Sequence, residues 1–121
     1  MDDVQLRYPT HVDHVAVALA QFCGLYFQAK AENGDSEAPF SGIFHFSAAE
    51  RYTKYEMVMA MAETLRMDAS HVIADKSTAK STTSAKRPHN AQLSCDDLQR
   101  LDISVHSDFR QEIKSVLEPF L

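Results

Sequence analysis

Glycine, cysteine and basic residues are all scarce in this sequence of 121 residues, and tryptophan is absent. Its three glycines, Gly24, Gly34 and Gly42, are spaced too widely for a glycine-rich dinucleotide turn or a P-loop, so a complete nucleotide site of either kind is excluded. The 12 Lys and Arg residues are outnumbered by 17 Asp and Glu residues. The resulting net charge of −5 argues against a general nucleic-acid-binding protein, which usually carries a basic face.

Long apolar runs and metal-ligand clusters are missing as well. No run approaches the roughly 18 apolar residues that span a bilayer, and the N-terminal stretch MDDVQLRYPT lacks the pattern of a secretion signal. The two cysteines, Cys23 and Cys95, lie far apart without metal-ligand spacing, which is typical of reduced thiols in the cytosol. We therefore expect one soluble cytoplasmic domain without a membrane or nucleic-acid partner.

The periodicity of apolar residues predicts two longer helices in the first half of the chain. From Val12 to Tyr26 apolar residues recur every three or four positions, and Thr10 is placed to cap that helix. TKYE, residues 53–56, is a capping box and predicts the start of a second amphipathic helix.

Two shorter helices are predicted in the second half. Ser94 is placed to cap a helix that carries Leu98 and Leu101. Ser107 is placed to cap a last helix, which Pro119 closes.

Three short segments have the alternation of strands, namely residues 4–6, 42–47 and 71–75. Residues 32–39 and 76–86 are polar, which predicts loops in both places. Because helices alternate with short strands, the expected fold class is α/β or α+β.

The pattern search finds no catalytic or metal constellation. Tyr26 and Lys30 match a Tyr-x-x-x-Lys spacing, but Tyr26 continues the apolar stripe of its helix, so packing is the better interpretation. His11 and His14 lie one helical turn apart without a third ligand in reach, which favours capping or surface roles. His45 is expected to be half-buried in its strand. No catalytic, cofactor-binding or metal residue is therefore predicted.

Arg87 is the one ligand-pocket candidate. It directly precedes Pro88, and a proline pushes the residue before it towards an extended backbone. An arginine held in that way is suited to a forked contact with a carboxylate or phosphate.

Four stretches occur in an order that resembles a known group of proteins: QLRYPTHVDHVA (5–16), GIFHFSAAERYTKYEM (42–57), RPHNAQLSCDDL (87–98) and FRQEIKSVLEPFL (109–121). Together they resemble the C-terminal, substrate-binding half of the extended short-chain dehydrogenase/reductase group. Within it, the chain is similar to the dTDP-4-dehydrorhamnose reductases and to the beta, or regulatory, subunits of methionine adenosyltransferase. TKYEM, RP-x-NAQL-x-C and the terminal PFL favour the beta subunits.

The resemblance implies that residues 1–121 form a single partial domain, a reductase-like (RmlD-like) substrate-binding lobe without the N-terminal Rossmann half. NADP, which the family binds through that half, is then not expected to bind this chain alone. Arg87 inherits an anion-facing role, and Asn90 and Leu93 are expected to turn the chain into the next helix.

Three functional hypotheses follow from the resemblance. The first is a non-catalytic module that binds the catalytic subunit of methionine adenosyltransferase as a hetero-oligomer and supports S-adenosylmethionine synthesis. The second is the substrate lobe of an NADP-dependent dTDP-sugar reductase, which acts only with its missing half. The third is an inactive truncated product.

Overall fold

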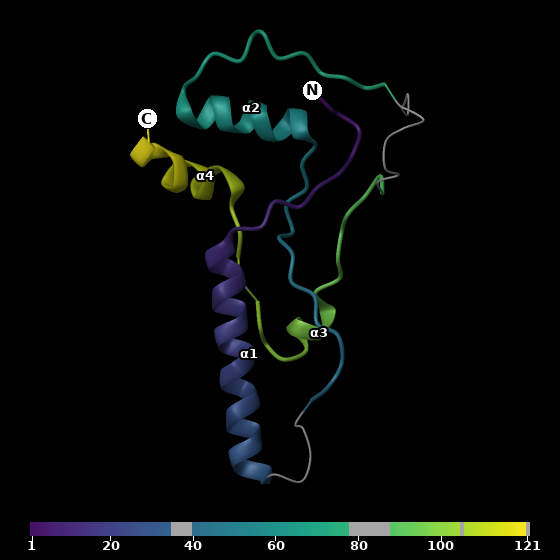
Figure 1. Ribbon diagram of the computed structural model, residues 1–121, viewed down its shortest axis with the longest axis vertical. Coiled ribbons are helices and arrows are strands. Elements are labelled where there is room, and N and C mark those ends of the chain that lie inside the picture. The colour runs from purple at the N-terminus through teal and green to yellow at the C-terminus, as the bar shows by residue number, and fades with distance from the viewer. Residues whose placement is uncertain (35–39, 78–87, 105, 121) are drawn as a thin grey trace.

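The computed structural model describes residues 1–34, 40–77, 88–104 and 106–120. These residues form α1 (Val12–Asn33), α2 (Lys54–Leu65), α3 (Asp96–Gln99), α4 (Phe109–Leu117) and a short 3-10 helix, η1 (Glu118–Phe120). Figure 1 shows α2 and α4 together in the upper half, while α1 runs down one side of the lower half with α3 across from it. None of the helices in the described residues is long and apolar enough to cross a membrane.

The predicted first helix is confirmed, but its cap is one residue later than expected. The Nδ1 atom of His11 accepts a hydrogen bond from the N–H of Asp13 (3.1 Å) and so caps α1. The hydroxyl of Thr10 is occupied elsewhere, because it accepts from the N–H of Ala48 (3.0 Å). Thr10 therefore ties the start of α1 to a segment that lies 38 residues away in the sequence.

The capping box predicted at residues 53–56 is confirmed in both directions. The hydroxyl of Thr53 accepts from the N–H of Glu56 (3.1 Å), and the carboxylate of Glu56 accepts from the N–H of Thr53 (2.7 Å). Thr53 is buried, and its hydroxyl also donates to Asp3 (2.8 Å). One side chain thus both starts α2 and joins it to the N-terminal segment.

The caps predicted for the two short helices are each displaced by one residue. The hydroxyl of Ser94 accepts from the N–H of Asp96 (3.2 Å), but Cys95 is the residue that directly flanks α3. Asp108, rather than Ser107, caps α4 through its carboxylate. Aspartate and serine are equally good caps, so composition alone does not separate two neighbours of these types.

The end of α4 also differs slightly from the prediction. The helix ends at Leu117, and Pro119 lies within η1, which continues the turn by three residues. Proline is tolerated there because the first turn of a helix does not need its missing N–H.

The three predicted strands are wrong for the described part of the chain. Only isolated bridges occur, between Asp2 and Asp75, Leu6 and Asn90, and Arg7 and Tyr52. Residues 42–47 have no bridge at all. Alternation sets which side chains share a face, but a strand also needs a neighbour with which to form a hydrogen-bond ladder. The α/β class is therefore not confirmed, since the described chain is helical with extended connections.

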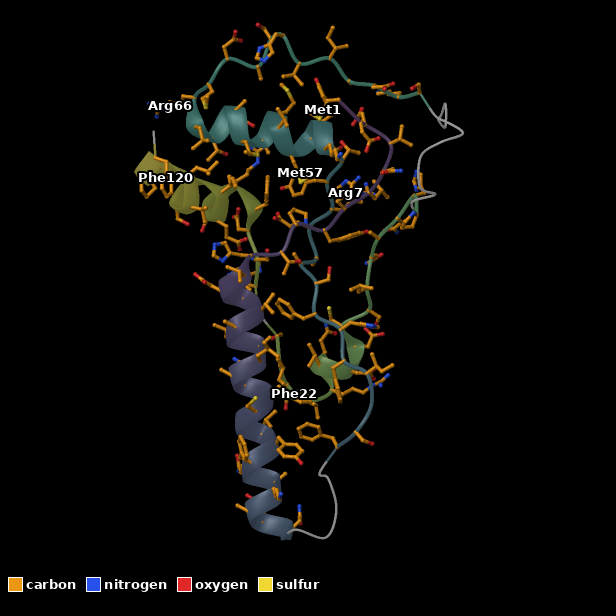
Figure 2. The ribbon with its side chains drawn as sticks, viewed as in Figure 1. Met1, Arg7, Phe22, Met57, Arg66 and Phe120 are labelled. Atoms are coloured by element: carbon orange, nitrogen blue, oxygen red, sulfur yellow. The ribbon has the colours of Figure 1, made fainter. Side chains whose placement is uncertain are left out.

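A small hydrophobic core holds the lower half together. Its buried members are Ala18 of α1, Leu98 of α3 and Ile103. Four partly buried side chains pack against them: Phe22, Phe44, Phe46 and Leu101. Phe22 projects from α1 towards the segments opposite it (Figure 2). This core fixes α3 against residues 44–46, and the candidate site lies beside it.

Candidate functional site

An open cleft of about 660 Å³ lies where three segments meet beside α3. Its walls are residues 46–49, Asn90, residues 92–96, Leu98, Gln99 and Ile103. We call this space the ligand cleft. It is built from both polar and apolar groups.

The segment that follows Pro88 is held in place by the N-terminal segment. The N–H of Leu6 donates to the carbonyl of His89 (2.7 Å), and the N–H of Ala91 donates to the carbonyl of Leu6 (3.3 Å). The side-chain oxygen of Asn90 then accepts from the N–H of Gln92 (2.9 Å), which closes a local turn. The predicted role of Asn90 in turning the chain into the next helix stays a prediction.

Leu93 makes a different contribution from the one expected. Its side chain is 46% exposed and lines the ligand cleft. It supplies apolar surface to the cleft and is not packed inside the turn.

Cys95 joins two walls of the ligand cleft. Its sulfur accepts from the N–H of Ser47 (3.3 Å), and its thiol donates to the carbonyl of the same residue (3.5 Å). Cys95 and Cys23 are both free cysteines, as expected for reduced thiols. The paired contact fixes the distance between residues 47 and 95 and therefore the width of the cleft.

The polar groups of the ligand cleft are mostly uncharged. They come from Ser47, Asn90, Gln92, Ser94, Cys95, Asp96 and Gln99. Amides and hydroxyls both donate and accept hydrogen bonds, whereas the single carboxylate only accepts when ionised. Such a lining is suited to hydrogen bonding with a polar ligand.

Arg87, the predicted ligand contact, lies outside the described residues, and its role stays a prediction. The described chain resumes at Pro88, two residues before Asn90 reaches the cleft wall.

A second cavity, of about 380 Å³ and mostly apolar, lies between α1 and residues 40–46. Phe22 makes edge-to-face contacts there with Phe40 and Phe44, at centroid distances of 4.8 and 4.9 Å. Tyr26 also lines this cavity and packs against Phe40 (5.8 Å). The interpretation of Tyr26 as a packing residue is confirmed.

The histidines divide into structural and exposed ones. His11 caps α1, as the capping alternative predicted. His45 is exposed and belongs to no strand, so the prediction of a half-buried strand histidine is wrong. Among the described residues there is no group of three or more His, Cys, Asp or Glu that could hold a metal ion.

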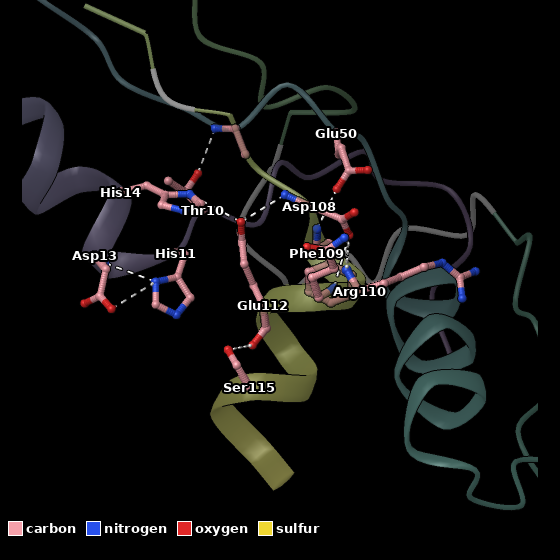
Figure 3. Close-up of polar contacts among 12 residues, drawn as sticks. Thr10, His11, Asp13, His14, Glu50, Asp108, Phe109, Arg110, Glu112 and Ser115 are labelled. Carbon is pink, nitrogen blue, oxygen red and sulfur yellow. Dashed lines mark hydrogen bonds and ion pairs between the residues drawn. The ribbon is translucent and has the colours of Figure 1, made fainter.

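Polar contacts join α4 to both α1 and the segment before α2, as Figure 3 shows. The carboxylate of Glu112 accepts from the N–H of Asp108 (2.9 Å) and lies 3.3 Å from Nδ1 of His14. The carboxylate of Glu50 accepts from the N–H of Phe109 (2.7 Å). We call these five residues the polar junction. It orients α4 and does not reach the ligand cleft.

Two pKa shifts accompany the packing around α4. Burial raises the pKa of the Tyr52 phenol, and the negative charge of Glu50 adds to that effect. A hydrogen bond to the Glu63 carboxylate, together with its charge, raises the pKa of the Arg110 guanidinium. Both shifts belong to contacts that hold α2, α4 and Tyr52 together.

Pattern reasoning did not find the acidic members of the polar junction. Glu112 lies four residues after Asp108, a spacing that places it one turn along the helix and within reach of the cap. The spacing of four residues could therefore have predicted the hydrogen bond between Asp108 and Glu112. Glu50 carries no local signal, because its partner is 59 residues away.

Comparisons with known proteins agree with the arrangement of motifs. The family model described as "RmlD substrate binding domain" matches residues 1–121. The chain is 39% identical over 121 residues to "Methionine adenosyltransferase 2 subunit beta" of Bos taurus and of Mus musculus, covering 100% of this chain and 33% of each relative. The Danio rerio protein of the same name is 37% identical, with 99% of this chain and 35% of that relative covered.

The chain therefore spans about a third of the length of the curated relatives that it matches. The match to the family model, in contrast, includes every residue of the chain. On this evidence the chain belongs to the RmlD substrate binding domain family.

Proposed function

We propose that this chain is a non-catalytic, regulatory module of a methionine adenosyltransferase. In this role it binds the catalytic subunit and thereby supports S-adenosylmethionine synthesis. The observation that carries the proposal is the identity of 34–39% along the chain to proteins named as a beta subunit of that enzyme. The matched region covers 100% of the chain, so no single motif accounts for it.

The chemistry of the ligand cleft supports a binding role. Its described lining offers amide, hydroxyl and thiol groups, with Asp96 as the one carboxylate. These groups recognise a ligand by hydrogen bonds, and the contact between Cys95 and Ser47 holds the two walls at a fixed separation.

Co-purification with a catalytic subunit tests the proposal. The folded chain, checked by circular dichroism, is immobilised and incubated with the purified catalytic subunit of bovine methionine adenosyltransferase. The full-length Bos taurus subunit beta serves as the positive control. Retention of the catalytic subunit by both baits supports the proposal, whereas retention by the positive control alone rejects it for this chain.

We also propose that Arg87 faces an anionic ligand at the ligand cleft. Two residues separate it from Asn90 in the cleft wall, and Pro88 restricts its backbone. Thymidine diphosphate is a suitable probe, because the reductases of this group act on dTDP-sugars. Arg87→Ala is expected to weaken its binding about tenfold or more, the loss of one charge-assisted contact. Lys86→Ala is the matched control, and equal affinities of the two variants would exclude a specific role for Arg87.

The alternative function is that of a substrate lobe in an NADP-dependent reductase of the dTDP-4-dehydrorhamnose type. The ligand cleft of about 660 Å³ favours it, since this volume is in the range of small-molecule sites. The test is to add the N-terminal Rossmann half of a dTDP-4-dehydrorhamnose reductase and a dTDP-4-dehydro sugar and to follow NADPH oxidation. Oxidation that needs both parts would favour the reductase function, and no oxidation would leave the regulatory proposal preferred.

A further inference from the structure

We draw no further inference here: the strongest candidate, the mostly apolar cavity between α1 and residues 40–46, shares Leu19 with the exposed apolar side of α1, and nothing in the structure shows what covers either of them.

Discussion

Thr53 offers a sharp test of how the N-terminal segment is tied to α2. The hydroxyl of this buried residue accepts from the N–H of Glu56 and donates to the carboxylate of Asp3. Replacing Thr53 by alanine removes both hydrogen bonds and one methyl group. Replacing it by serine removes the methyl group alone.

These contacts determine how much each replacement is expected to lower the free energy of unfolding. Loss of an N-cap costs about 1 kcal/mol, and loss of a hydrogen bond to a charged group costs about 1.5–3 kcal/mol. Within the described residues, Asp3 then keeps an ion pair with Lys76, whose ammonium lies 3.8 Å away and is largely exposed. Because neighbouring contributions are not fully additive, we expect Thr53→Ala to lower the free energy of unfolding by about 3 kcal/mol. Thr53→Ser, which loses one buried methyl group, is expected to lower it by about 1 kcal/mol.

Urea unfolding followed by far-ultraviolet circular dichroism measures both values. A double-mutant cycle with Asp3→Ala isolates the hydrogen bond between two residues that are 50 positions apart, and a coupling energy of about 1 kcal/mol or more is expected. If alanine and serine destabilise the chain equally, or if the coupling energy is zero, the hydroxyl of Thr53 does not join the two segments.

Three further changes have defined outcomes. Asn90→Ala removes the hydrogen bond from the N–H of Gln92 to the side chain and should lower the free energy of unfolding by about 1 kcal/mol. An unchanged midpoint in urea titrations would show that this hydrogen bond does not stabilise the chain. Hydrogen bonds from the N–H and hydroxyl of Ser70 hold the pKa of the Asp68 carboxyl below its ordinary value of 3.8. This depressed pKa adds stability above pH 3.8 that is lost as the pH falls through the folded-state pKa, so Ser70→Ala should move the pKa of Asp68 upwards in an NMR titration. Phe22→Ala should destabilise the lower half by about 3 kcal/mol or more in the same denaturant assay, because it empties the aromatic cluster beside α1.

Local signals predicted the helices well. The capping box at residues 53–56 satisfies its own backbone donors within four residues, so its sequence contains all the information needed. The first helix was equally clear, because its apolar residues repeat over many turns. The cap of α4 was displaced by one residue because Ser107 and Asp108 are equally good caps, whereas the displacements from Thr10 to His11 and from Ser94 to Cys95 do not have this explanation.

Non-local features were the ones that sequence reasoning missed. Residues 42–47 alternate as a strand does, but strand formation depends on a partner that the pattern does not identify. The ligand cleft lies between residues 46–49 on one wall and Asn90 with residues 92–96 on the other, and the hydrogen bonds between Ser47 and Cys95 that join these walls span 48 positions. Nothing local in the sequence indicates that Ser47 and Cys95 are in contact, whereas the hydrogen bond from Gln92 to Asn90 is local.

The hydrogen bonds that join distant segments in the upper half affect how the chain folds during its synthesis on the ribosome. The ammonium group of Met1 donates to the carbonyl of Ile73, 72 residues later, and the N–H of Phe109 donates to Glu50 across 59 residues. Translation proceeds at roughly 5–20 residues per second, so the N-terminal segment waits several seconds for its partners to emerge. Contacts of such large sequence separation also form slowly. The apolar face of α1 therefore stays exposed until α3 has emerged, and that of α2 until α4 has emerged, and in this interval chaperones can bind the nascent chain.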